Sequence, residues 1–125
     1  MQVRLLGPVD VTVGGVPRPV SGVRRKAVLA ALALQPGQVV SADRLADIVW
    51  GGAAAALNTL QSHVSHLRRV LGEPGAIRAR PPGYLLDLGP DGTDVQTAER
   101  LIHEAAASTD PGRRASRLRD AMALW

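Results

Sequence analysis

The sequence predicts an α+β fold, and three patterns along the chain carry this prediction. Val9, Val11 and Val13 alternate with polar residues, as in a half-buried β-strand. Later segments have apolar residues spaced three and four apart, which is typical of amphipathic helices. Two short runs then flank Pro81-Pro82-Gly83, which predicts a β-hairpin. We therefore expect an N-terminal antiparallel sheet, three helices, a C-terminal hairpin and a further helical segment.

The composition limits both the number of domains and the chemistry. With 125 residues, the chain is long enough for one compact domain, or for a small domain plus a fragment. Aromatic residues are scarce although 46% of the residues are hydrophobic, so the core must be aliphatic. The lack of cysteine excludes disulfides and thiolate metal sites. The sequence contains no signal-peptide pattern and no apolar run of membrane length, which predicts a cytoplasmic protein.

Charge is distributed unevenly along the chain. Residues 1–90 hold ten Arg or Lys and five Asp or Glu, a net charge of +5, whereas residues 91–125 have a net charge of −1. A basic excess confined to the first part is expected of a surface that meets phosphate. A merely soluble basic domain explains the same excess, so charge alone leaves both interpretations open.

The first elements are expected to be short strands. Residues 2–6, 9–13 and 16–20 form strand-like runs, and Gly14-Gly15 between the last two is a hairpin signal. Pro17 and Pro19 lack the N–H that a central strand donates. The third strand should therefore lie at an edge of the sheet.

Three helices are expected next. Residues 23–34 are rich in good helix formers and stop before Pro36-Gly37. After a very short strand at 39–40, Ser41 is a natural N-cap for a second helix that ends at Trp50. Its apolar residues at i, i+3, i+4 spacing are Leu45, Ile48 and Val49. The longest helix covers residues 54–71 and ends at Gly72.

The rest of the chain predicts a hairpin and two more helices. Strands at 77–80 and 84–88 flank the Pro-Pro-Gly tip, and the composition of residues 89–92 is that of a linker. Residues 94–107 and 113–124 then read as helices. Because two helices alone bury little surface, we expect them to belong to a larger helical unit.

The helix over residues 54–71 carries the most informative surface. Leu60, Val64, Leu67 and Leu71 fall on one stripe, which we expect to face the core. The opposite face is small, polar and weakly basic, and its side chains can address base edges or phosphates. This face holds Asn58, Ser62, Ser65, His66 and Arg69, with Thr59 beside it. An ordinary solvated helix face is the alternative, although such faces usually mix acids and bases.

The hairpin favours contact with DNA. Pro81-Pro82-Gly83 makes a stiff tip that projects Arg80, and an arginine on a narrow hairpin can enter the electronegative minor groove. Tyr84 can either donate its hydroxyl to a phosphate or pack inside the domain, and both roles stay open. A polar helix followed by an arginine-tipped hairpin predicts a domain that holds the major and minor grooves together.

Metal binding and catalysis have little support. His63 and His66 lie three residues apart with no third His or Cys nearby, whereas zinc sites need three or four ligands. The Gly-rich pieces lack the Lys and Ser/Thr spacing of a phosphate-binding loop, and the scattered Asp residues make no evident acid–base pair. We therefore expect no metal, no cofactor and no enzymatic activity.

Taken in order, these motifs resemble the winged helix-turn-helix of OmpR-type response regulators, and more closely the Streptomyces antibiotic regulatory protein (SARP) family. The resemblance covers essentially the whole chain and implies a winged-helix DNA-binding domain over residues 1–90. It is carried there by Leu6-Gly7-Pro8, Arg24-Arg25-Lys26-Ala27-Val28-Leu29-Ala30, Val39-Val40-Ser41, Leu45, Trp50-Gly51, Asn58-Thr59-Leu60-Gln61, Val64-Ser65, Leu67-Arg68-Arg69 and Arg80-Pro81-Pro82-Gly83-Tyr84. Residues 93–125, with Ala121-Met122-Ala123-Leu124-Trp125 at the end, resemble the start of the helical, TPR-like bacterial transcriptional activation domain of that family.

The resemblance implies a role for each matching position. Trp50, Thr59 and His63 match positions that meet phosphates. Gln61, Ser62 and His66 match positions that face bases. Arg80 matches the wing arginine, and Tyr84 matches a wing tyrosine that contacts the DNA backbone. Such a regulator binds promoter direct repeats as a side-by-side dimer, recruits RNA polymerase with its sigma factor, and controls a cluster of antibiotic or other secondary-metabolite genes. It would be cytoplasmic and associated with the nucleoid.

The sequence departs from the family pattern in two places. The loop at 52–56 is short, rich in alanine and without proline, whereas relatives have an acidic, Pro-rich loop that faces polymerase. Asn58 and His66 stand where relatives often have Arg, so base preference and phosphate affinity should differ. A winged helix can also bind a protein partner in place of DNA, and this interaction module is the alternative function.

Overall fold

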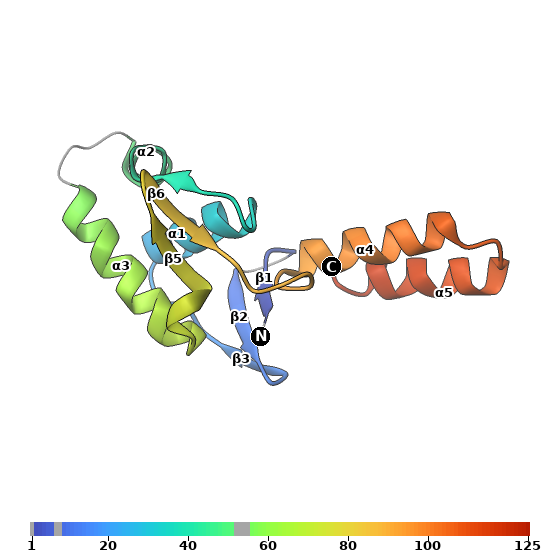
Figure 1. The fold of residues 1–125 in the computed structure, drawn as a ribbon. Helices are drawn as coiled ribbons and strands as arrows, with labels where there is room; N and C mark the ends of the chain where they lie inside the picture. Colours follow the sequence, from blue (N-terminus) through green and yellow to red (C-terminus); the bar gives the residue numbers. More distant parts are fainter. Residues whose placement is uncertain (1, 7–8, 52–55) are drawn as a thin grey trace.

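A computed structural model describes residues 2–6, 9–51 and 56–125, without the side chains of residues 56–58 and 74. The helices are α1 (Val23–Ala33), α2 (Ala42–Trp50), α3 (Ala56–Leu71), α4 (Asp94–Ala107) and α5 (Pro111–Met122), with a 3-10 turn η1 (Pro74–Ala76). The strands are β1 (Gln2–Arg4), β2 (Asp10–Val13), β3 (Val16–Arg18), β4 (Val40–Ser41), β5 (Ile77–Arg80) and β6 (Gly83–Leu86). Figure 1 shows α1 to α3 and both sheets gathered together, while α4 and α5 project from them as a hairpin. The α+β class is confirmed.

The N-terminal sheet is antiparallel and has the order β1-β2-β3, so β3 is at the edge, as its prolines predict. Val3 pairs with Val11, and both side chains are fully buried, so the alternating valines do face the core. Gly14 and Gly15 turn the chain between β2 and β3 with φ of 58° and 79°. Glycine reaches this left-handed region without a steric penalty, which allows the tight turn.

The second sheet has the order β4-β6-β5, and its β5–β6 hairpin is the wing that the Pro-Pro-Gly tip predicts. Gly83 begins β6 and pairs with Ser41 in β4. A Cβ at Gly83 would overlap the Val40 carbonyl oxygen and lie 2.7 Å from the Ser41 Cα, so a glycine is needed at this crossing. The Ser41 hydroxyl also accepts the Arg44 N–H at 3.1 Å, which confirms the predicted N-cap of α2. The wing is therefore bound to the start of α2.

The core lies between α1, α2, α3 and the two sheets. The predicted stripe of α3 is buried throughout: Leu60, Val64, Leu67 and Leu71. In α2 the predicted stripe is wrong at one position, because Ile48 is 50% exposed. The buried face of α2 centres on Leu45, Ala46 and Val49. Around the helix, Ile48 lies next to Leu45 but on the side away from Ala46 and Val49, and so points toward solvent.

The α4–α5 hairpin also follows the sequence prediction. A capping box begins α4: the Thr93 hydroxyl accepts the Gln96 N–H and the Gln96 side chain accepts the Thr93 N–H, both at 3.0 Å. Asp110 caps α5 by accepting the Gly112 N–H at 2.9 Å. Small and apolar side chains bury the contact between the two helices, namely Ala98, Leu101, Ala105 and Ala121. On the outer surface, Leu118 and Met122 stay 40% and 73% exposed.

The segment at 89–92, whose composition predicts a linker, connects β6 to α4 and has a fixed path. Gly92 is buried, and its carbonyl accepts the Val3 N–H at 2.8 Å. The turn is therefore fixed against β1. Composition indicates that a segment can turn, but it carries no information about distant hydrogen-bond partners. The alanine-rich loop discussed above lies outside the described residues over 52–55.

Candidate nucleic-acid interface

The polar face of α3 is open to solvent. Thr59, Gln61, Ser62, Ser65 and Arg69 are exposed, whereas His63 and His66 are half-buried. The predicted contact Asn58 has a side chain outside the described part of the chain. No residue of α3 is acidic, and its last turn carries Arg68 and Arg69. The face therefore offers hydrogen-bonding groups and positive charge without a carboxylate that would repel phosphate.

Three helices meet beside the middle of this face. Trp50 at the end of α2 stacks on His63 of α3, with ring centroids 5.7 Å apart and planes inclined by 10°. The Arg24 guanidinium, from the start of α1, lies 5.8 Å from the Trp50 ring centroid, within the range of a cation–π contact. The structure thus brings together Trp50 and His63, two positions that the resemblance assigns to phosphate contact. It adds Arg24 and Arg25, which are far from both in the sequence.

The surroundings of His63 disfavour its charged form. The Arg25 Nε donates to its Nδ1 at 3.4 Å. Because a guanidinium only donates, Nδ1 must accept, and the neutral ring then carries its proton on Nε2. That Nε2 is buried and has no hydrogen-bond partner within the described structure. Burial lowers the pKa of His63, and the positive charges of Arg25 and Arg24 and the neighbouring His66 lower it further.

His66 lies one turn from His63 in the same electrostatic setting. Burial lowers its pKa, and Arg25 and Arg69 lower it further. Both imidazoles are therefore biased toward the uncharged form, in which a ring nitrogen can accept a hydrogen bond. The positive charge at this face comes from the arginines, and the two histidines add shape and hydrogen bonding.

The wing presents Arg80 at its tip. Arg80 ends β5 opposite Gly83 and is exposed, as are Pro81 and Pro82 beyond it. Tyr84, in the next position of β6, is half-buried and packs against the hydrophobic core. The packing role that the sequence left open for Tyr84 is therefore observed, and any DNA contact by its hydroxyl stays a prediction.

Other arginines of this part hold the fold together. Arg68 lies in the last turn of α3, and its Nε donates to the Ile77 carbonyl at 3.0 Å. This bond ties the end of α3 to the base of the wing. Arg78 pairs with Asp87 at 2.8 Å across the same hairpin. The sequence did not predict the Arg68 bond or the Arg25–His63 contact. Each joins residues from different elements, and the residue pattern of one segment does not indicate its partner in another.

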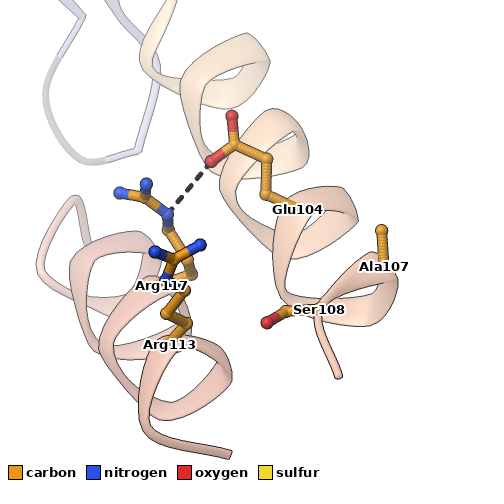
Figure 2. Close-up of a pocket in the computed structure, with 5 residues that line it drawn as sticks. All are labelled: Glu104, Ala107, Ser108, Arg113 and Arg117. Carbon is orange, nitrogen blue, oxygen red and sulfur yellow. Dashed lines mark ion pairs between the residues drawn. The ribbon is translucent and has the colours of Figure 1, made fainter. Parts of the chain in front are cut away.

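Possible metal clusters and cavities of the described residues complete the picture of this surface. Among them, no group of three or more His, Cys, Asp or Glu could hold a metal ion. A cavity of about 290 Å³ lies between α4 and α5, away from α3, and is lined by Glu104, Ala107, Ser108, Arg113 and Arg117. Figure 2 shows the Glu104–Arg117 ion pair, 3.2 Å long, spanning it. In the described chain, no helix is long and apolar enough to cross a membrane.

The geometry defines a class of protein. A core of three helices, with an exposed polar third helix followed by a β-hairpin wing, is a winged helix-turn-helix, a DNA-binding architecture. A family model described as "Transcriptional regulatory protein, C terminal" matches residues 22–86. The chain belongs to this family of OmpR-type DNA-binding domains, and within it to the SARP regulators, as the sequence resemblance predicted.

Individual relatives agree with this assignment. The Regulatory protein DnrI of Streptomyces peucetius is 34% identical over 140 residues, covering 100% of this chain and 52% of the relative. The Transcriptional regulator RedD of Streptomyces coelicolor is 30% identical, covering 100% of this chain and 39% of the relative. The chain therefore spans about half or less of the length of these relatives, which are named as regulators and not as enzymes.

Solved structures show the same fold. A structure described as Mycobacterium tuberculosis EmbR in complex with a low affinity phosphopeptide matches with a TM-score of 0.85 and 30% identity, over 99% of this chain and 35% of that chain. The DNA-binding domain of Klebsiella pneumoniae RstA, in complex with the RstA box, matches with a TM-score of 0.54 and 27% identity, over 62% of this chain and 82% of that chain.

Proposed function

We propose that α3 enters the major groove of promoter DNA while Arg80 reaches into the adjacent minor groove. The observation that carries this proposal is the acid-free, exposed polar face of α3 beside an arginine-tipped wing. Short side chains on α3 let the helix approach base edges, and a guanidinium suits the negative potential of a narrow minor groove.

The proposed contacts divide into two kinds. Side chains on the outward face of α3 read bases, and those at its margins meet phosphate. We assign Gln61, Ser62 and His66 to bases, and Trp50, Thr59, His63 and Tyr84 to the DNA backbone, with Asn58, Ser65 and Arg69 alongside. The lowered pKa of His66 supports a base contact in which an uncharged ring accepts a hydrogen bond.

The cluster of Trp50, His63 and Arg25 has a supporting role in this proposal. Its stacked rings fix the end of α2 against α3, and the bond from Arg25 fixes the start of α1. Arg24 and Arg25 are thereby held on the same side as the α3 face, where each can neutralise a phosphate. This arrangement compensates for a recognition helix that has few arginines of its own.

At the level of the whole protein, the proposal is a transcription activator of the SARP type. Residues 1–90 serve as the DNA-binding domain and residues 93–125 begin the activation domain. The protein binds promoter direct repeats as a side-by-side dimer in the cytoplasm, at the nucleoid, and recruits RNA polymerase through its sigma factor. The names of the relatives DnrI and RedD support regulation, and the family resemblance supports an antibiotic or secondary-metabolite gene cluster as the target.

Selection from random double-stranded DNA, followed by binding at ~50 and ~200 mM salt, tests this function. Phosphate contacts release counterions, so affinity for the selected site should fall by about 10³-fold or more over that range if six or more phosphates are neutralised. Recovered repeats with a fixed spacing would support the dimer. Failure to enrich any sequence, together with salt-insensitive binding, would reject DNA recognition and favour a protein-interaction module.

A further inference from the structure

Asp94 is a buried carboxylate in the first turn of α4, at the place where the helical hairpin joins the winged helix. Only 1% of its surface is exposed. Its Oδ1 accepts the Leu5 N–H at 2.7 Å and its Oδ2 accepts the Leu6 N–H at 2.9 Å. Oδ1 also accepts the N–H of Val95, its neighbour in α4, at 2.9 Å. One side chain thus joins the end of β1 to the start of α4.

Other bonds close the same junction. The Val3 N–H donates to the Gly92 carbonyl at 2.8 Å, and Val3 forms a parallel bridge with Thr93. The Gln2 Nε2 donates to the Thr97 Oγ1 at 2.9 Å. β1 therefore has β2 along one edge and the entry to α4 along the other. Because these N–H groups are already hydrogen-bonded, β1 cannot shift relative to α4 without losing buried hydrogen bonds.

Ordinary helix capping does not account for Asp94. The Thr93–Gln96 capping box already satisfies the Thr93 and Gln96 N–H groups, and only one of the three bonds of Asp94, from the Val95 N–H, lies within α4. Asp110 offers an internal comparison, since it caps α5 with a single backbone bond and is exposed to solvent. Burying a carboxylate is costly unless it is fully hydrogen-bonded, and both oxygens of Asp94 are used across the junction. The free-energy cost of burying this carboxylate is explained if the role of Asp94 is to hold the junction together.

The turn before Asp94 is also restricted to one path. A Cβ at Gly92 would lie 2.5 Å from the Leu88 Cβ and 3.2 Å from the Leu88 backbone, so the chain folds tightly back on itself there. Gly89 takes a φ of 87°, in the region that favours glycine. Leu88 packs against the core of the winged helix. The segment that connects β6 to α4 is therefore fixed at both of its ends.

We propose that Asp94 is a positioning residue that locks α4 and α5 to the winged helix as one rigid body. The likeness to the EmbR structure supports this, because it extends over 99% of the chain and so includes both parts in similar placement. The consequence for gene control rests on the proposed function: with α3 in a groove, the hairpin keeps one direction relative to the DNA. Two copies on repeated sites then meet only at a spacing that this direction allows.

Pulsed electron double resonance measures this rigidity directly. The chain has no cysteine, so spin labels attach only where cysteines are introduced, at the exposed positions Asp47→Cys in α2 and Ala115→Cys in α5. The doubly labelled protein should give a narrow distance distribution. Asp94→Asn, which turns an N–H donor toward the N–H groups of Leu5 and Leu6, should widen that distribution at least about twofold. The matched control Asp110→Asn should leave the width unchanged.

Three outcomes overturn the proposal: an unchanged width in Asp94→Asn, an equal widening in Asp110→Asn, or a broad distribution before any change. If circular dichroism finds Asp94→Asn unfolded, Gln2→Ala decides, since it removes only the outer bonds that the Gln2 side chain donates to the Thr97 hydroxyl and the Asp91 carbonyl. This variant should widen the distribution by a smaller amount, and an unchanged width would reject the lock. The measurement uses no DNA. A narrow distribution in a protein that fails to bind DNA would reject the proposed function and leave the rigid junction standing.

Discussion

Replacing Gly83 with alanine should detach the wing from the body of the domain. β6 crosses β4 so closely at this residue that an added Cβ would overlap the Val40 carbonyl oxygen and lie 2.7 Å from the Ser41 Cα. Both neighbours are backbone atoms and cannot rotate away. To restore ordinary contact, the strands would have to separate by roughly 1 Å, which is enough to forfeit much of their attraction.

The magnitude follows from what this separation disrupts. Forcing one extra carbon into a packed site costs about 1–3 kcal/mol. The bond from the Ala42 N–H to the Pro82 carbonyl, 3.1 Å long, lies at the same crossing, and its loss adds about 1 kcal/mol. The total is about 2–4 kcal/mol. At about 4 °C per kcal/mol for a chain of this size, Tm should fall by about 8–16 °C.

Thermal unfolding followed by circular dichroism measures this effect, with Gly75→Ala as the matched control. A Cβ at Gly75 meets no atom within 4 Å, so this variant should unfold within about 2 °C of the original protein. The Gly83→Ala protein should also bind DNA more weakly, because the strand that carries Arg80 pairs with β6. Equal melting temperatures for the two variants would refute the account of how the wing is anchored.

Two further predictions concern the histidines of α3. The pKa of His63 and of His66 is lowered in the folded protein, and an unfolded histidine titrates near 6.5, so the unfolded chain takes up protons first as the pH falls. The two neutral histidines therefore contribute fully to the free energy of unfolding above about pH 6.5, and this contribution is lost progressively below that pH. Urea unfolding at pH 7.5 and 5.5 should show that a His63→Gln/His66→Gln protein loses less stability between these pH values than the original protein does. An equal loss in the two proteins would contradict the assignment. Trp50→Ala removes the ring that stacks on His63 and should raise the pKa of His63 toward its ordinary value, as an NMR titration would detect. A pKa that does not move would mean that Trp50 does not bury this imidazole.

Local patterns in the sequence predict the elements and their buried faces well. Leu60, Val64, Leu67 and Leu71 report the core face of α3 because helical spacing alone puts them on one side. Ser41 caps α2 as its chemistry requires, and Pro17 keeps β3 at the edge of its sheet. In each case one short segment holds all the information that the prediction needs.

Contacts between distant segments could not be predicted in this way. The ring stack of Trp50 and His63 joins the end of one helix to the middle of another, and periodicity describes each helix separately. The requirement for glycine at Gly83 comes from β4, about forty residues earlier in the chain. Arg68 looks like any basic residue on a polar face until the Ile77 carbonyl is in place to accept its bond. Asp94 likewise looks in the sequence like an ordinary residue at the start of a helix, but its partner Leu5 lies near the N-terminus of the chain.

The salt dependence of DNA binding by an Arg80→Ala protein tests the central claim most directly. The measurement compares it with the original protein and with Arg119→Ala, which removes the same charge from an exposed position on α5, in the hairpin that projects away from α3 (Figure 1). If Arg80 meets DNA phosphates from the wing, its loss should flatten the slope of log K against log salt by about one unit, while Arg119→Ala leaves the slope unchanged. An unchanged slope for Arg80→Ala, or equal flattening in both variants, would contradict the proposed docking of the wing.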